Sequence, residues 1–375
     1  MTDTAEDLLF DLTLTDDQRM NRETMQRFAA AEFRPVGQLV DSGDSPLEDC
    51  LPKTADLGLS LLPIPEALGG AGMARSPVSN ALILEDLAHG DTALALAAVA
   101  PLSFVNTVLD QGSPAQQEKY LPLFCEGQFL AATTALLEPR ATFEPTAPTM
   151  TATAKGEGNE RRYTLNGTKS LVPLGMDAQL IIAIAVLENG SPAAFIIEGS
   201  PEGLTRVREE NMGMNGAQMA TLTFNNVELT ADALLGDSEF NLQRFLDLSR
   251  IGICALTVGT CQAVLDYVGP YANERIAFGE PISNRQAVAF MIADIAIELE
   301  GMRLMTWRAA SQAERGEDFH EAAYLAKVQC DNYSMKIGTD GVQLLGGHGF
   351  TKEHPVELWY RNLRAIAILE GLASA

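Results

Sequence analysis

Basic residues are scarce in this chain. Lys and Arg together number 26 against 50 Asp and Glu, which gives a formal net charge of −24 over 375 residues. A surface of that sign repels polyanions, so we expect neither nucleic acid nor an anionic membrane as a partner. Any site for a phosphate-bearing molecule then needs a local exception, for which Arg250, Arg275, Arg361 and Arg364 are the candidates.

Cysteine is also rare and follows no pattern. The five cysteines are scattered, odd in number and never spaced as CxxC, which argues against a disulfide framework or a cysteine metal site and favours a reducing compartment. The first residues are acidic and lack the apolar stretch of a signal peptide, and no run of about 18 apolar residues is evident. From these absences we expect a cytoplasmic protein without a membrane span.

Helical signals fill the first third of the chain, and we predict an N-terminal helical domain over residues 1–128. Thr15 precedes two acids and predicts a helix start, as does Ser113 before Pro114. A proline- and glycine-rich loop over 63–72 separates helices. The Ala- and Leu-rich residues 77–100 predict one buried helix.

Between residues 129 and 238 the composition changes, and we predict a middle β domain. Thr, Val and Ile become dense, and residues 180–186, 193–197 and 220–227 are expected to be strands. Asn166-Gly167 within 163–169 predicts a tight turn between two strands.

Long amphipathic segments return in residues 239–375. Segments 245–271, 286–316 and 321–345 are separated by short loops, which is typical of an antiparallel helical bundle. The predicted fold class is therefore α+β, with a helical domain, a β domain and a four-helix-bundle-type domain in that order.

Three motifs carry the chemistry. They are Arg275-Ile-Ala-Phe278-Gly279-Glu-Pro281-Ile282, then Gln343-Leu-Leu-Gly346-Gly347-His348-Gly349-Phe350, then Ile368-Leu369-Glu370-Gly371. An arginine pairs well with phosphate, and glycines let backbone N–H groups approach an anion. A carboxylate can act as a base. Each motif alone is weak evidence, and their order and spacing give them weight.

In this order the motifs resemble the acyl-CoA dehydrogenase family of flavoproteins, and the resemblance extends over nearly the whole chain. Further matching segments are 57–72, 112–128, 163–169 and 246–250. The resemblance implies an FAD cofactor that lies across a subunit boundary, an acyl-CoA substrate, and an electron-transfer flavoprotein as acceptor.

Six residues match the side of the cofactor site that one subunit lends to its neighbour. The resemblance places them around the adenosine diphosphate part of the neighbour's FAD: Arg275, Phe278, Gln286, Gln343, Gly346 and Gly347. Two simpler interpretations remain open. One is that Arg275 is an exposed helix-end arginine. The other is that the glycine pair is a helix C-terminus with a left-handed glycine, which is compatible with phosphate binding.

Glu370 stands where the family's best-known catalytic base stands. A base must take the α-proton of an acyl thioester while FAD accepts the β-hydrogen as hydride, and burial raises a carboxylate's pKa toward that task. The alternative base position on the long helix carries Ser249, which cannot serve. A solvated acid is the simpler interpretation of Glu370. Asp247 and Arg250 match substrate contacts, or form a helix salt bridge.

The flavin-facing motifs depart from the family pattern. Leu136-Leu137 replaces a Thr-containing pair before Glu138-Pro139, Leu171-Val172-Pro173 replaces Trp-Ile-Thr, and Leu372-Ala373-Ser374-Ala375 follows Glu-Gly. The chain therefore keeps the residues that would bind a neighbour's FAD and lacks the residues that would hold the ring of its own flavin. We expect a complex with a paralogous subunit, as in α2β2 members of the family, some of which act on steroid side chains. A non-catalytic structural subunit and a self-sufficient homotetramer are the alternatives.

Overall fold

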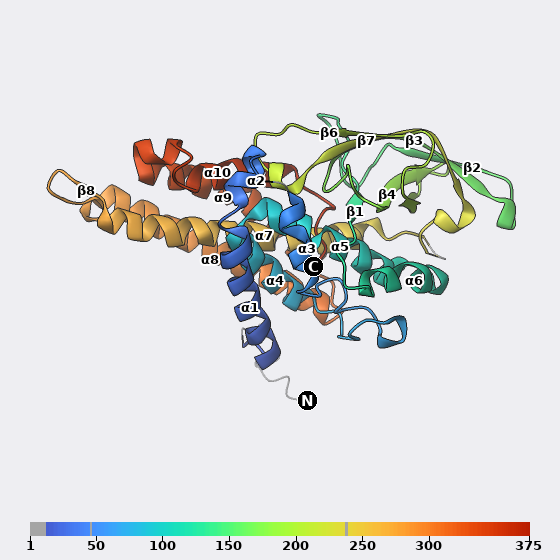
Figure 1. The fold of residues 1–375 in the computed structure, drawn as a ribbon, viewed down its shortest axis with the longest axis horizontal. Coiled ribbons are helices and arrows are strands. Elements are labelled where there is room, and N and C mark those ends of the chain that lie inside the picture. The colour runs from blue at the N-terminus through green and yellow to red at the C-terminus, as the bar shows by residue number, and fades with distance from the viewer. Residues whose placement is uncertain (1–12, 46, 237–238) are drawn as a thin grey trace.

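The computed structural model describes residues 13–45, 47–236 and 239–375, and its three parts follow one another along the chain (Figure 1). A helical part comes first, a twisted sheet with short helical turns follows, and long helices complete the molecule. The predicted α+β fold class, with its order of helical, β and helical parts, is confirmed. The acidic N-terminal residues 1–12 and the predicted boundary at 238 lie outside the described residues.

Helices of the N-terminal part begin where the capping residues predict. Thr15 and Gln18 form a reciprocal capping box at α1, and Ser113 and Gln116 form another at α6. The α-helices of this part are α1 (Asp16–Phe28), α2 (Gly37–Ser42), α3 (Leu51–Ala55), α4 (Pro77–Gly90), α5 (Thr92–Gln111) and α6 (Pro114–Tyr120).

The prediction of one buried helix over 77–100 is wrong, because Asp91 divides the segment into α4 and α5. Asp91 has an extended backbone, and its carboxylate accepts a hydrogen bond of 2.9 Å from Leu94 N. An aspartate in that position caps the following helix. The hydrophobic pattern runs across the break because both helices are buried, so periodicity alone does not reveal it.

A seven-stranded mixed sheet forms the middle part. Its strands are β1 (Ala132–Ala135), β2 (Thr151–Lys155), β3 (Arg162–Val172), β4 (Leu180–Leu187), β5 (Pro192–Glu198), β6 (Leu204–Arg208) and β7 (Ala220–Thr230). The strand order is β1-β4-β2-β3-β7-β6, with β5 paired to β4. The strands predicted over 180–186, 193–197 and 220–227 are confirmed as β4, β5 and β7.

The predicted hairpin turn at Asn166-Gly167 is wrong, since β3 continues through both residues. The register with β7 shifts between Leu165 and Gly167, which marks a β-bulge. A Cβ at Gly167 would lie 2.8 Å from Met150, so glycine is required by close packing there. Bulges and tight turns use the same residue types, and only strand pairing distinguishes them.

The C-terminal part consists of long helices, as predicted. They are α7 (Leu242–Glu274), α8 (Gln286–Glu314), α9 (His320–Leu345) and α10 (Val356–Ala365), with a small β8 (Ile276–Ala277) and β9 (Glu280–Pro281) pair between α7 and α8. Figure 1 shows that α8 and the β8 hairpin project away from the sheet. The end of this bundle farthest from the sheet is therefore available to other chains.

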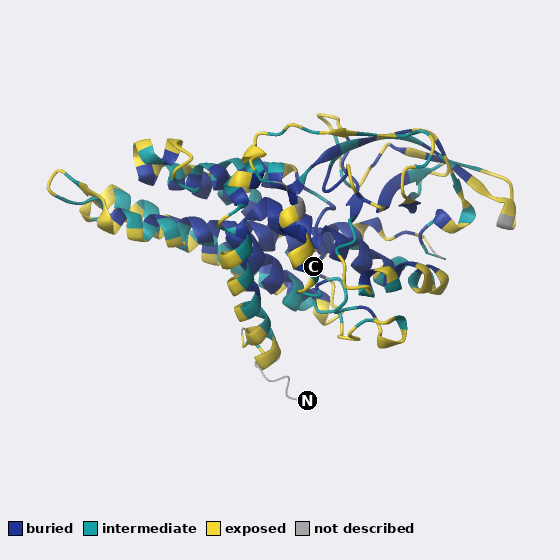
Figure 2. Ribbon diagram, in the orientation of Figure 1, coloured by how far each residue is buried: buried dark blue, intermediate teal, exposed yellow. Residues whose placement is uncertain are grey.

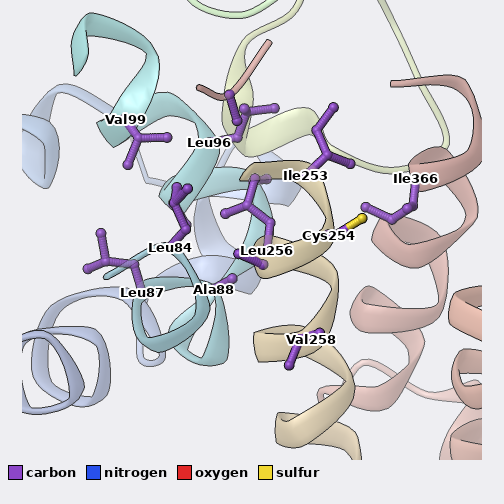
Figure 3. Close-up of a cluster of buried hydrophobic side chains, with 14 of the residues drawn as sticks. Leu84, Leu87, Ala88, Leu96, Val99, Ile253, Cys254, Leu256, Val258 and Ile366 are labelled. Carbon is purple, nitrogen blue, oxygen red and sulfur yellow. The ribbon is translucent and has the colours of Figure 1, made fainter. Parts of the chain in front are cut away.

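The main core lies where α4, α5 and α7 pack together (Figures 2 and 3). Figure 3 shows side chains of all three helices, together with Ile366 from the turn after α10, in one cluster. By length and composition α5 and α7 are apolar enough to cross a membrane, but 94% and 78% of their apolar windows are buried inside the protein. Both are helices of the protein core.

A glycine fixes how closely α4 and α7 approach. A Cβ at Gly259 of α7 would lie 2.0 Å from the carbonyl oxygen of Glu85, whereas one at Gly301 of α8 meets only a flexible side-chain atom at 4.0 Å.

We predict that Gly259→Ala lowers the free energy of unfolding by about 1–3 kcal/mol or more, because the helices must separate. Gly301→Ala should leave it unchanged or raise it by about 0.5–1 kcal/mol. Denaturant unfolding measures both, and equal effects would contradict the prediction.

Candidate active site

Glu370 lies on the turn that follows α10 and the short 3-10 helix Ile366–Ile368. Gly371 after it has a φ of 73°, and a Cβ there would lie 2.6 Å from Leu136. The Thr134 hydroxyl of β1 donates a hydrogen bond of 2.6 Å to the Gly371 carbonyl. The Glu-Gly motif thus joins the last helix to the first strand, and its glycine is required by both backbone angle and space.

Arg250 of α7 meets Glu370 across 120 residues of sequence, and it also pairs with Asp247 of the same helix. Arg250 Nε lies 3.3 Å from each oxygen of the Glu370 carboxylate, and its Nη1 lies 3.2 Å from Asp247 Oδ1. The three side chains are only 8%, 13% and 4% exposed for Arg250, Glu370 and Asp247. Glu370 is therefore not a solvated acid, and the helix salt bridge between Asp247 and Arg250 is present.

Sequence reasoning missed a second group of polar residues that α9 brings to this site. Lys327 is buried, and its Nζ donates to Asp331 Oδ1 at 2.7 Å and to the Ile366 carbonyl at 3.2 Å. His320 Nδ1 lies 3.0 Å from Asp247 Oδ2, and the Arg250 guanidinium lies 5.7 Å from the Tyr324 ring centre. The sequence signal for this group was Lys327 followed four residues later by Asp331. That spacing places both side chains on one face of a helix.

Burial raises the pKa of Glu370 above its ordinary value, while the Lys327 and Arg250 charges pull it back down. Burial likewise raises the pKa of Asp331. A carboxylate loses solvation when it is buried, so its charged form becomes less favourable. Glu370 consequently has the environment of a carboxylate that can accept a proton. The two cations limit how far its pKa rises.

The six predicted cofactor residues lie elsewhere, and all six are exposed. Arg275 ends α7, Phe278 is 97% exposed on the β8–β9 hairpin, and Gln286 begins α8. Gln343 is in the last turn of α9, which ends at Leu345 and is capped by Gly346. The glycine pair therefore stands at a helix C-terminus, but Gly346, with a φ of 57° and a ψ of −127°, does not have the left-handed helical conformation.

A tyrosine joins the two segments that carry those residues. The Tyr271 hydroxyl lies 2.9 Å from His348 Nδ1 and donates to the Leu345 carbonyl at 3.4 Å. Tyr271 is one helical turn before Arg275, whose N–H donates to the Tyr271 carbonyl. The structure thus ties the Arg275 motif to the Gly346 motif at one end of the bundle, separate from Glu370.

Family models match most of the chain. The acyl-CoA dehydrogenase N-terminal domain matches residues 15–128, the middle domain residues 133–227 and the C-terminal domain residues 241–373. The chain is also 30% identical to the human short-chain specific acyl-CoA dehydrogenase of mitochondria over 367 residues, which covers 96% of this chain and 87% of that protein. The chain belongs to the acyl-CoA dehydrogenase family.

Two solved structures that superpose closely on the chain agree with this assignment. Butyryl-CoA dehydrogenase from Megasphaera elsdenii superposes with a TM-score of 0.87 at 29% identity, over 96% of this chain and 95% of that one. The FAD complex of PigA superposes with a TM-score of 0.86 at 25% identity, over 96% and 95% of the two chains. FAD is the cofactor that membership of this family assigns.

The residues of this chain fit the pyrophosphate part of FAD and do not fit its flavin ring. The exposed group around Arg275 and Gly346 offers a cation, two amides and bare backbone, which suit a pyrophosphate. Among the residues that replace the expected flavin contacts, Leu137 is buried, and Leu171 is packed against the main core. Glu370, Arg250 and Leu171 are absent from the linings of four of the cavities in the described part of the chain.

A buried ion pair supports the strand ends beside this apolar region. Lys169 of β3 is fully buried, and its Nζ donates to Glu138 Oε1 at 3.0 Å and to the Leu136 carbonyl at 2.9 Å. Burial lowers the pKa of Lys169 to about 8, although the Glu138 charge opposes that effect. Glu138 also accepts hydrogen bonds from the Thr149 and Met150 backbone. The Lys169–Glu138 pair therefore fixes β3 to the segment that follows β1.

The buried Glu370 predicts a definite pH dependence of stability. The pKa of Glu370 is raised in the folded protein. Its contribution to stability is therefore fully present below the unfolded-state pKa of 4.5 and is lost as pH rises through the folded-state pKa. Relative to Glu370→Gln, the wild type should therefore lose stability as pH rises above about 4.5, by about 1.4 kcal/mol for each unit of pKa difference. Unfolding titrations at several pH values measure this.

Glu317→Gln is the opposite-sign control for that experiment. Arg315 lowers the pKa of the exposed Glu317, so the wild type should gain slightly over this variant as pH rises. A wild type whose stability tracks that of Glu370→Gln at every pH would contradict the prediction.

Proposed function

We propose that this chain is a subunit of an FAD-dependent acyl-CoA dehydrogenase and that Glu370 is the base for α,β-dehydrogenation of an acyl-CoA thioester. The observation that carries the proposal is the environment of Glu370. Its carboxylate is 13% exposed, is held 3.3 Å from Arg250 Nε, and has a pKa raised by burial. Family membership and the match of the Ile-Leu-Glu-Gly motif to the family's base position support the same role.

The proposed reaction removes two hydrogens from adjacent carbons. Glu370 takes the α-hydrogen as a proton, and the electron pair of that C–H bond becomes the second bond between Cα and Cβ. FAD, when bound, supplies the acceptor for the β-hydrogen and its electron pair. The contribution of this chain is to hold the Glu370 carboxylate in place, because Arg250 contacts both carboxylate oxygens. Asp247 in turn orients Arg250.

We further propose that the chain works in an assembly with a paralogous subunit whose FAD it helps to bind. Arg275, Phe278, Gln286, Gln343, Gly346 and Gly347 are exposed, so they are available to a neighbour's nucleotide. An apolar stripe on α8 supports an assembly, since Phe290, Ile297 and Leu304 recur every seven residues and are 58%, 67% and 43% exposed. An electron-transfer flavoprotein is the acceptor proposed from the family.

One group of observations favours the alternative, a non-catalytic subunit that only completes its partner's FAD site. Residues 372–375 are buried and held against α5 and α7, where Ser249 Oγ accepts from Leu372 N at 3.1 Å and Ser103 Oγ accepts from Ser374 N at 2.9 Å. Leu136 packs against Gly371 next to Glu370. These contacts leave the side of Glu370 toward the core closely packed.

Flavin content tests the assembly. The chain expressed alone should bind little FAD, whereas co-expression with the paralogous chain should give a yellow complex. In that complex Arg275→Met should lower retained FAD at least tenfold, because a charged contact to the pyrophosphate is lost (about 1.5–3 kcal/mol). Arg27→Met in the exposed part of α1 is the matched control and should change nothing. Near-stoichiometric 450 nm absorbance from the chain alone would reject the heteromer.

Turnover of the complex tests the base. Glu370→Gln keeps the shape and removes the proton acceptor, so we expect acyl-CoA oxidation to fall by about 10²-fold or more with FAD content unchanged. Glu357→Gln on α10 removes another carboxylate that pairs with an arginine, and it should leave turnover intact. Unchanged turnover in Glu370→Gln would establish the non-catalytic alternative.

A further inference from the structure

Lys327 of α9 is buried beside the candidate base without touching it. Its side chain is 4% exposed, and the ammonium donates to Asp331 Oδ1 at 2.7 Å and to the Ile366 carbonyl at 3.2 Å. A buried ammonium is costly unless it is paired, so the position requires an explanation beyond packing. A methionine or leucine would fill such a place in a helical core without that cost.

The Ile366 carbonyl connects Lys327 to the turn that carries Glu370. Ile366 begins the 3-10 helix Ile366–Ile368, and its side chain is fully buried in the main core, in the cluster that also holds Cys254 of α7 (Figure 3). Its carbonyl also accepts from Leu369 N at 3.2 Å. The start of this turn is therefore fixed by its side chain in the core and by its carbonyl on Lys327, four residues before Glu370.

The charges around Glu370 do not balance. Arg250 from α7 and Lys327 from α9 are the cations, and Asp247, Asp331 and Glu370 are the carboxylates. His320 adds a contact to Asp247 from the half-exposed side, and Tyr324 packs near Arg250. These are two cations for three carboxylates, and within the described residues the one ion-pair partner of Glu370, Arg250, also pairs with Asp247. Removing either cation would leave one positive charge among three negative ones.

We propose that Lys327 is a positioning residue for Glu370: its buried ammonium ties the Glu370 turn to α9 and, balanced by Asp331, sets how firmly the Glu370 carboxylate holds a proton. The inference rests on the proposed function of Glu370 as a base. A base must be ionised when substrate arrives and must hold the proton afterwards. Lys327 favours the first condition, and Asp331, as a further negative charge, favours the second. The Lys327 charge lowers the pKa of Glu370 and the Asp331 charge raises it, which agrees with these roles.

Two substitutions of opposite sign test the proposal. Lys327→Met removes the cation and should raise the proton affinity of Glu370 about tenfold or more, which is an upward shift of about one pH unit or more in its titration. Asp331→Asn removes the neighbouring negative charge, leaves the lysine in place, and should shift the titration downward. A merely structural role predicts no such reversal, since damage to α9 would expose Glu370 in both variants and move both titrations the same way.

The same helix provides a matched control. Lys336 and Asp340 form another pair four residues apart on α9, with Nζ 2.6 Å from Oδ2, and neither is among the main groups that shift the pKa of Glu370. Lys336→Met and Asp340→Asn should leave the Glu370 titration where it is in the wild type.

The measurement uses the full chain and does not need bound FAD. The carboxyl carbon of Glu370 in ¹³C-glutamate-labelled protein, assigned by its absence in Glu370→Gln, is followed by NMR between about pH 3 and pH 9. Opposite shifts in Lys327→Met and Asp331→Asn support the proposal. Shifts of the same sign in both variants, or none in either, overturn it. If Lys327→Met does not fold, the downward shift in Asp331→Asn decides, because the Lys327 contact to Ile366 is kept there.

Turnover of the co-expressed complex separates this proposal from the proposed function. When Glu370 is the base, the acid limb of the kcat/KM pH profile should move upward in Lys327→Met and downward in Asp331→Asn. Opposite NMR shifts together with full activity of Glu370→Gln would mean that Lys327 tunes Glu370 although Glu370 is not the base. Loss of activity in Glu370→Gln without any NMR shift would keep the base and reject the role of Lys327.

Discussion

Helix α7 passes its neighbours so closely that only glycine fits at two places along it. At Gly259 the neighbour is the carbonyl of Glu85 in α4, and at Gly252 it is the carbonyl of Ala373, 2.4 Å from where a Cβ would be. Most of the rest of this 33-residue helix is buried. Helices α4 and α9 and the C-terminal segment all pack against α7. The position of α7 therefore decides where the residues around Glu370 lie.

Burial at that helix has an electrostatic consequence. Asp247 and Arg250 are carried into the interior by an otherwise apolar helix, where they pair with each other and Arg250 also pairs with Glu370. Buried charges persist only with partners, so the ion pairs restrict which arrangement of α7, α9 and the C-terminal turn is stable. The strongly acidic composition adds to the effect, since every buried carboxylate competes for few cations.

The candidate base and the predicted cofactor residues lie in different surroundings. The buried group around Glu370 faces the interior, while Arg275, Phe278 and the glycine pair after α9 face outward on the far end of the bundle. Tyr271 keeps the two outward segments together through His348 and Leu345. The candidate base and the predicted cofactor residues therefore belong to different parts of the molecule.

The sequence alone determined the local features of this protein. Capping residues such as Thr15 and Ser113, the long amphipathic helices, the fold class and the family motifs are all local patterns, because each depends on residues within a few positions of one another. Tertiary structure decided the rest. The break at Asp91, the continuous β3 through Asn166-Gly167, and the meeting of Lys327 with the Glu370 turn depend on which distant segments pack together. Charges 120 residues apart become partners only when burial removes the water between them, and no local pattern records that.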